Sequence, residues 1–318
     1  MADLNLNARA VAVADRMVER AEELRVAVHT IGGARVIDAG IDAIGGFAAG
    51  EAMAHACMAD LGRVSFAPLA LGGETYHGLQ VWTDHPAIAC MASQYAGWAV
   101  SVDDYFAMGS GPLRSVARVE HELFDKLGYS EHADRGVIVL ETRAMPTPRI
   151  VEWVSERASL PASALTFIVA PTASLAGGVQ IAARIIETGL HKMNTLGFDV
   201  TRVTSAYGTA PVPPVAKNDL RAIGRTNDCI LYGGQARYTV RADDAELEAL
   251  AEQLPASASA DYGTPFFEIF ERYERDFYKI DKLLFSPGEV WLTNATTGRT
   301  FHAGAVNPSI LRASLFGK

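Results

Sequence analysis

The stretch Leu165–Met193, LTFIVAPTASLAGGVQIAARIIETGLHKM, decides the fold class of this 318-residue chain. It begins with an apolar run, Leu165–Ala170, whose length is typical of a buried strand. A loop of small and hydroxyl-bearing residues, 171–178, leads into a segment with helical spacing, Val179–Met193. A strand, a short loop and a helix in this order form the repeating unit of α/β folds.

The helix expected at Val179–Met193 carries one narrow polar stripe. Its members lie four, three and four positions apart, which places them on one helix face: Gln180, Arg184, Glu187 and His191. The remaining positions are mostly apolar, as in a helix enclosed by protein, so we expect the stripe to face a cavity that holds the chemistry. The alternative is that Arg184 and Glu187 form a weak surface ion pair of about 0.2–0.5 kcal/mol.

The same alternation continues on both sides of this stretch and predicts an α/β fold with helices covering a sheet. Near the N-terminus a hairpin is expected to turn at Gly32 and Gly33. The expected strands are 25–29, 34–38, 79–83, 98–102, 137–141, 165–170, 200–206, 228–232, 289–294 and 299–303. The expected helices are 5–24, 48–60, 86–96, 113–119, 150–157, 179–193, 218–224, 243–253, 264–275 and a short one after Asn307-Pro308.

Shifts in composition predict two α/β domains. The candidate boundaries are a charged stretch, Glu120–Arg135, and an Ala/Ser-rich run, Pro255–Ala260. We expect both ends of the chain, 1–130 and 262–318, to build the first domain and residues 131–261 to build the second.

Composition indicates a globular protein with a small-molecule partner. The 28 basic and 37 acidic residues give a net charge of −9 without a long basic block, which argues against nucleic acid as a partner. Charged residues near the N-terminus interrupt the apolar run that a signal peptide needs, and no window approaches the ~18 apolar residues of a membrane span. We therefore expect a cytoplasmic protein that does not bind membranes.

The sequence lacks the patterns of several common catalytic centres. The eight histidines show no H-x-x-x-H or H-E-x-x-H spacing and the three cysteines no C-x-x-C pair, so we expect no metal. The G-x-S-x-G motif of serine hydrolases is also absent. A hydrolase with Cys57 or Cys90 as its nucleophile remains an alternative from another enzyme class.

What remains is a carboxylate and a guanidinium one helical turn apart, a pairing suited to the activation of water. Glu187 can accept a proton from water, while Arg184 orders that water and stabilises the negative charge on Glu187. The loop 171–178 adds the hydroxyls of Thr172 and Ser174 at the positive end of the helix dipole, where an anion could bind. The loop matches no nucleotide-binding motif, so it can also be a simple tight turn.

Several long segments, in the same order from Asn5 to Phe316, resemble the methenyltetrahydromethanopterin cyclohydrolases of one-carbon metabolism in archaea and methylotrophic bacteria. The most specific are AGWAVSVDDYFAMGSGP (96–112), IVAPTASLAGGVQIAARIIETGLHKM (168–193), TNDCILYGG (226–234), LPASASADYGTPFFEIF (254–270) and ERDFYKIDKLLFSPGEV (274–290).

The resemblance implies a homotrimer of two-domain α/β subunits that bind the pterin between the domains, with no metal or organic cofactor. It implies reversible hydrolysis of 5,10-methenyl-tetrahydromethanopterin to the 5-formyl compound. It also implies that Arg184 and Glu187 occupy the positions of the family's catalytic R-x-x-E pair. The short active-site segment before Gly-Trp falls on three residues: Gln94, Tyr95 and Ala96. The loop departs from the family pattern at Ala173 and Gly178, where hydroxyl residues are expected. The alternative is a pterin- or phosphate-binding protein without turnover.

Overall fold

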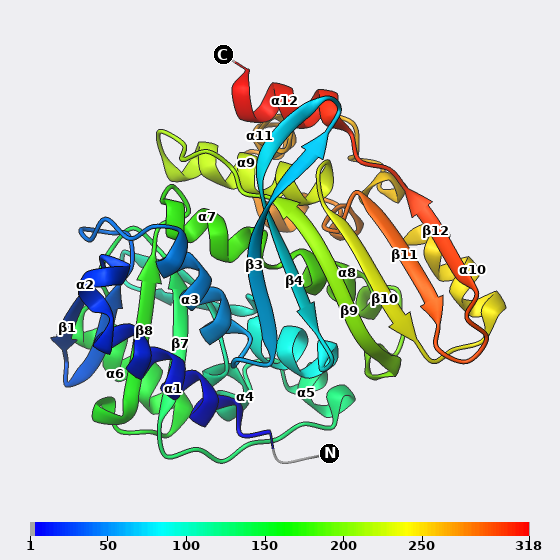
Figure 1. Ribbon diagram of the computed structural model, residues 1–318. Coiled ribbons are helices and arrows are strands. Elements are labelled where there is room, and N and C mark those ends of the chain that lie inside the picture. The colour runs from blue at the N-terminus through cyan, green and yellow to red at the C-terminus, as the bar shows by residue number, and fades with distance from the viewer. Residues whose placement is uncertain (1–3, 318) are drawn as a thin grey trace. The chain divides into compact units, whose positions relative to one another are not determined.

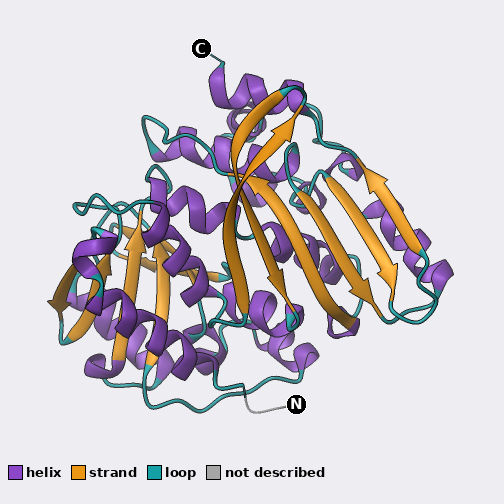
Figure 2. Cartoon of the chain, in the orientation of Figure 1, coloured by secondary structure: helices purple, strands orange, loops and turns teal. Residues whose placement is uncertain are grey.

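The computed structural model describes residues 4–317 and shows a mixed α/β protein with two six-stranded sheets (Figure 2). Contacts along the chain define two compact units, each built around one of the sheets. Within the described residues, the first unit comprises residues 4–62 and 88–180, and the second comprises residues 63–87 and 181–317.

This division differs from the ranges expected from the sequence. Residues 131–180 were expected in the second domain but belong to the first unit, because their strands pair with strands of residues 34–38 and 105–110. Residues 63–87 belong to the second unit, because their second strand pairs with the strand of residues 203–211. Pairing between strands so distant in sequence leaves no mark in local composition.

The sheet of the first unit has the order β1-β2-β8-β7-β6-β5. Its centre, β2-β8-β7, is parallel, and antiparallel strands are added at both edges. The expected turn at Gly32 and Gly33 is confirmed, and both residues have the positive φ that favours glycine, 56° and 86°. The strands are β1 Ala27–Ile31, β2 Ala34–Asp38, β5 Trp98–Val102, β6 Tyr105–Ser110, β7 Gly136–Glu141 and β8 Leu165–Ala170.

Helices cover both faces of this sheet, which explains why its central strands are continuous apolar runs. In Figure 1, α1 (Leu6–Glu19) and α3 (Phe47–Cys57) lie in front of β7 and β8 and pack on one face. The opposite face packs against α6 (Pro148–Ala158). The other helices of this unit are α2 Ala21–Leu24, α4 Leu113–Ala117, α5 His121–Leu127, the π-helix η1 Ala87–Gln94, the 3-10 helix η2 Ala162–Ala164 and most of α7 Leu175–Ala182.

The sheet of the second unit has the order β12-β11-β10-β9-β4-β3 and contains one parallel pair, β10 with β11. Helices α8 and α10 pack against one of its faces. The other face is open, and opposed residues place Trp82 beside Tyr207 and Arg237 beside Trp291 on it. The strands are β3 Gly62–Leu71, β4 Glu74–Thr83, β9 Val203–Pro211, β10 Gln235–Val240, β11 Glu289–Asn294 and β12 Thr300–Gly304.

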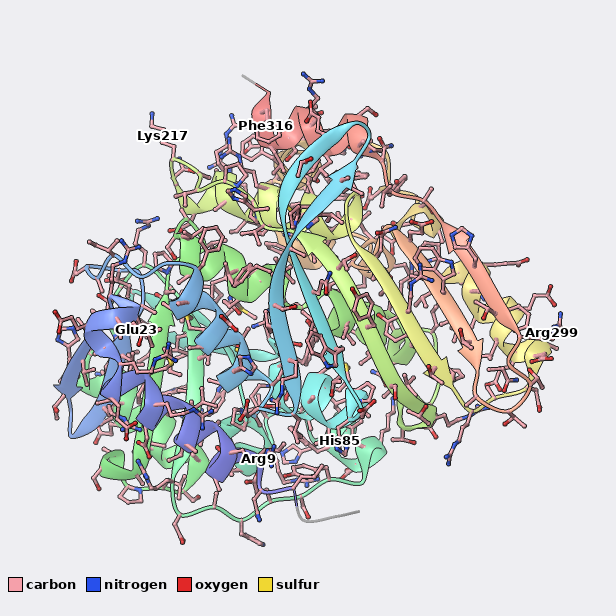
Figure 3. The ribbon with its side chains drawn as sticks, viewed as in Figure 1. Arg9, Glu23, His85, Lys217, Arg299 and Phe316 are labelled. Atoms are coloured by element: carbon pink, nitrogen blue, oxygen red, sulfur yellow. The ribbon has the colours of Figure 1, made fainter. Side chains whose placement is uncertain are left out.

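An apolar cluster of this unit gathers α9, α11 and α12 around Tyr232, Phe266 and Leu311. At the far end of the sheet, Arg299 in the β11–β12 turn pairs with Asp244 of α10 at 3.2 Å, and Figure 3 shows it at that edge. The helices are α8 Ile185–Thr195, α9 Asp219–Leu231, α10 Asp244–Gln253, α11 Phe266–Arg272 and α12 Pro308–Phe316, with 3-10 helices at η3 Val200–Arg202, η4 Ala256–Ala258, η5 Phe277–Lys279 and η6 Lys282–Leu284.

Several sequence-based expectations of secondary structure need correction. The strand expected at 228–232 is the last part of α9, because Asp228 is buried there and accepts a hydrogen bond from the Phe266 amide at 2.8 Å. The helix expected at 86–96 is the π-helix η1. Strands β3, β6 and β10 were not expected, and β3 contains Pro68, which is tolerated because β3 is an edge strand. Within residues 4–317, no helix is both long and apolar enough to cross a membrane.

Candidate active site

The polar stripe lies on two helices and not on one continuous helix as expected. Helix α7, Leu175–Ala182, ends before Arg184, and Arg184 is the N-cap residue of α8 with φ −82° and ψ 6°. At the junction the Arg184 amide donates to the Ile181 carbonyl at 2.9 Å, a three-residue turn that interrupts the helical hydrogen-bond pattern. The break places Glu187 in the first turn of α8, where the helix dipole stabilises negative charge.

Arg184 and Glu187 are both buried, with 8% and 5% of their surface exposed. The Arg184 Nη1 and Glu187 Oε2 atoms lie 3.9 Å apart, too far for a direct hydrogen bond but close enough for a strong electrostatic interaction. Burial excludes the alternative of a surface ion pair. Two opposite charges held 3.9 Å apart are close enough for both to contact one small molecule such as water.

The other two members of the stripe are also enclosed by protein. Gln180 is buried, and His191 is half-buried on the second turn of α8. Burial, together with the positive charge of Lys282, lowers the pKa of His191 below its usual value. We therefore expect His191 to be neutral at physiological pH.

Close packing against the second sheet fixes the position of α8. The Tyr238 hydroxyl on β10 donates to the Ile186 carbonyl at 3.0 Å, and a Cβ atom at Gly189 would lie only 2.0 Å from that hydroxyl oxygen. On β9, a Cβ atom at Gly208 would lie 2.7 Å from Ile185 Cγ2. Two glycines therefore allow the backbone that carries Glu187 to approach the sheet closely.

In the first unit, Thr172 and Ser174 follow the carboxyl end of β8, next to the carboxyl end of β7. The buried Thr172 donates a hydrogen bond to Glu141, the last residue of β7. Ser174 caps α7, because its Oγ accepts from the Gly177 amide at 3.0 Å and donates to the Pro171 carbonyl at 2.8 Å. The carboxyl edge of parallel strands is where α/β proteins bind ligands.

Asp38 is a residue of this edge that the sequence analysis missed. It ends β2, is fully buried and accepts hydrogen bonds at 2.6–2.9 Å from four consecutive amides, those of residues 40–43. The loop that it orders passes so close to Ser174 that a Cβ atom at Gly40 would lie 2.8 Å from the Ser174 Oγ. An acidic residue at the end of an apolar strand was the available signal for both Asp38 and Glu141.

Gln94, Tyr95 and Ala96 lie where the π-helix η1 ends, also in the first unit. Gln94 is fully buried, whereas Tyr95 and Ala96 are half-buried. Single π-helical turns occur frequently at functional sites, and sequence periodicity does not distinguish them from α-helix.

The cysteines do not have the surroundings of reactive thiols. Cys57, Cys90 and Cys229 are all buried, and burial raises the pKa of Cys229 well above its usual value. Reactive cysteines are partly exposed and lie near positive charge, so these surroundings argue against the cysteine-hydrolase alternative. Among residues 4–317, no group of three or more His, Cys, Asp or Glu side chains is arranged to hold a metal ion.

Comparison with known proteins identifies the family. The family model described as Cyclohydrolase (MCH) matches residues 5–315 of this chain. The chain belongs to this cyclohydrolase family. It is 39% identical to the methenyltetrahydromethanopterin cyclohydrolase of Methanococcoides burtonii, over 98% of each chain. It is 42% identical to the enzyme of that name from Methylobacterium organophilum, over 98% of this chain and 97% of the relative. The cyclohydrolase from Methanocaldococcus jannaschii is 39% identical over 98% of each chain.

The match to the cyclohydrolase family covers both units of the fold, because it extends over nearly the whole chain. It therefore includes the π-helix segment, the loop after β8 and the Arg184–Glu187 pair. The family that the sequence analysis inferred from five segments is confirmed by these relatives.

Proposed function

We propose that this chain hydrolyses 5,10-methenyl-tetrahydromethanopterin reversibly to 5-formyl-tetrahydromethanopterin. The relatives that match it over 96% or more of their length carry the name of this cyclohydrolase. The observation that carries the mechanism is the buried pair of Arg184 and Glu187 in the first turn of α8.

In this mechanism Glu187 is the general base. The methenyl carbon of the substrate lies between two nitrogens in a cationic, amidinium-like system, so it is already electrophilic. Glu187 removes a proton from water as the water oxygen forms a bond to this carbon, which gives a neutral carbinolamine-type adduct. Collapse of the adduct breaks the bond from this carbon to the other nitrogen, which takes the proton that Glu187 received. The adduct hydroxyl releases its proton to solvent and becomes the oxygen of the formyl group on N5. In the reverse direction the same carboxylate and its proton serve the dehydration.

Arg184 has two tasks in this scheme. Its guanidinium donates hydrogen bonds that orient the water, and its charge, 3.9 Å from the Glu187 carboxylate, stabilises the ionised base. General base catalysis contributes about 10²- to 10⁴-fold to a rate, so the positioning of water and substrate must supply the rest.

We further propose that Gln94, Tyr95, Ala96, Thr172 and Ser174 bind the pterin. Ser174 already uses its hydroxyl to cap α7, so we expect it to act mainly by fixing the loop. The homotrimer, the binding of substrate between two domains, the absence of a metal or organic cofactor and the cytoplasmic location remain predictions from the resemblance and from composition.

The test follows the methenyl chromophore, whose near-ultraviolet absorbance disappears on hydrolysis. The wild-type protein should remove it, and Glu187→Gln should bind the pterin with little change in affinity but lose at least about 10²-fold in kcat. Exposed Glu248 on α10 provides the control, since Glu248→Gln should leave turnover unchanged. Near-normal activity of Glu187→Gln would remove Glu187 from the mechanism. Binding of the pterin without turnover by the wild-type protein would favour the binding-protein alternative.

A further inference from the structure

The π-helix η1 ends at Gln94–Ala96, the segment that the proposed function assigns to the pterin. Its last turn is closed by a π-type hydrogen bond from the Tyr95 amide to the Cys90 carbonyl at 2.7 Å. The carbonyl groups at the end of a helix lack partners within that helix and must find them elsewhere. The donors that bind these carbonyl groups also determine where the residues after the helix lie.

Arg114 on α4 supplies partners for two of them from a fully buried position, and the Ser93 carbonyl also accepts from the Gly111 amide at 2.9 Å. The Arg114 Nη1 donates to the Met91 carbonyl at 3.2 Å and to the Ser93 carbonyl at 3.3 Å. The centre of its guanidinium also lies 5.0 Å from the centroid of the Tyr95 ring, within the range of a cation–π interaction. One side chain therefore holds both the end of η1 and the residue that follows it.

Glu120 holds the guanidinium in this orientation. The Arg114 Nε donates to Glu120 Oε1 at 3.2 Å, and Arg114 Nη2 forms an ion pair with Glu120 Oε2 at 2.8 Å whose geometry is not that of a hydrogen bond. A planar guanidinium can contact both oxygens of a carboxylate at once, which the single ammonium of lysine does not reproduce. The carboxylate also supplies the opposite charge that a buried guanidinium requires.

Gly97 shows how closely the segment passes this pair. A Cβ atom at Gly97 would lie 1.5 Å from Glu120 Oε1 and 2.8 Å from Tyr95 Cε1. A side chain at position 97 would displace the carboxylate, so the segment contacts Arg114 at its start and passes directly beside Glu120 at its end.

We propose that Arg114 is a positioning residue for the substrate-binding segment Gln94–Ala96, with Glu120 as its orienting partner. This inference rests on the proposed function, which assigns the segment to the pterin. Arg114 acts through the backbone of the segment and through the Tyr95 ring. Because the segment holds the pterin equally in the ground state and the transition state, loss of its position raises KM and leaves kcat nearly unchanged.

Arg114→Lys is the direct test, because lysine keeps the positive charge but lacks the planar guanidinium. We expect KM for the methenyl pterin to rise about 10- to 100-fold with kcat within about twofold of wild type. Glu120→Gln should raise KM less, since its amide oxygen can still accept from Nε. Arg118→Lys is the matched control, because Arg118 lies nearer the surface, pairs with Asp125 at 2.6 Å and should leave both constants unchanged. Circular dichroism and thermal unfolding establish that each variant is folded.

The proposal is overturned if folded Arg114→Lys keeps the wild-type KM, including the case where only its thermal stability falls. A loss of kcat at unchanged KM also overturns it, since that result places Arg114 at the reacting atoms. If Arg114→Lys does not fold, Glu120→Gln replaces it, because it weakens the partner that orients Arg114 without touching the segment, and an unchanged KM in that folded variant overturns the proposal. Turnover by the wild-type protein in the same assay separates the two ideas. If the wild type does not hydrolyse the methenyl pterin the proposed function fails, and if it does while KM is unchanged in Arg114→Lys only this inference fails.

Discussion

Lys192 on α8 gives the stability of this protein a pH dependence that follows from its surroundings. Its side chain is fully buried, and its Nζ donates a hydrogen bond to the Pro255 carbonyl at 2.8 Å. Burial lowers the pKa of Lys192 from 10.5 to about 8, against the opposing effect of the Asp281 charge. At neutral pH the folded protein therefore holds a buried ammonium that is more stable in the unfolded chain.

The free-energy cost follows from the two pKa values. The difference between 10.5 and about 8 corresponds to about 3 kcal/mol of unfolding free energy. Below pH 8 the amine is protonated in both states and the whole cost is present. Between about pH 8 and 10.5 the folded state has lost the proton that the unfolded state still binds, so stability rises with pH. Above that range both states are neutral and the cost has disappeared.

Lys192→Met removes the charge and keeps an unbranched apolar side chain of similar length. The lost hydrogen bond to Pro255 costs about 1 kcal/mol at every pH. We therefore expect the variant to be about 2 kcal/mol more stable than wild type at pH 7 and about 1 kcal/mol less stable well above pH 10. Urea unfolding at pH 7, 9 and 10.5 measures this crossover.

The control is Lys279→Met, since Lys279 is half exposed and pairs with Glu274 at the surface. Its stability difference from wild type should not change between pH 7 and pH 9. A difference between Lys192→Met and wild type that stays the same from pH 7 to pH 10.5 would refute the reasoning from a buried amine.

Two further substitutions test α8 itself. Arg184→Lys keeps the positive charge but loses the planar guanidinium, so we expect kcat in the chromophore assay to fall at least about tenfold. Unchanged kinetic constants would reduce Arg184 to a packing residue. Gly189→Ala places a methyl group within 2.0 Å of the Tyr238 hydroxyl oxygen and should lower the free energy of unfolding by about 1–3 kcal/mol. Adding Tyr238→Phe, which removes that oxygen, should recover part of the loss in urea unfolding, and strictly additive effects would contradict the contact.

Much of the local structure could be predicted from the sequence. The apolar run Leu165–Ala170 predicted β8, and the Gly32-Gly33 pair predicted the first hairpin, because both signals depend on neighbouring residues alone. The apolar run at 228–232 was misread as a strand, because a run this short fits a buried helix equally well. Its true state is set by the contacts of Asp228 with residues far along the chain.

The candidate site was predicted in part. The spacing of Arg184 and Glu187 identified the pair, but the break between α7 and α8 that puts Glu187 in a first helical turn was not predicted. Asp38 and Arg114 were missed altogether. Each of them acts on backbone groups, and which backbone groups lie near them is known only from the tertiary structure.

The sequence by itself determined the alternation of strands and helices, the family and the spacing of the acid and the guanidinium. These are properties of short segments, in which side-chain period and chemistry are fixed by order along the chain. Only the tertiary structure decided which strands share a sheet, that Arg184 and Glu187 are buried and that Arg114 holds the end of a π-helix. Those features depend on pairing between residues far apart in sequence, where many partners are compatible with the same local pattern and packing selects one of them.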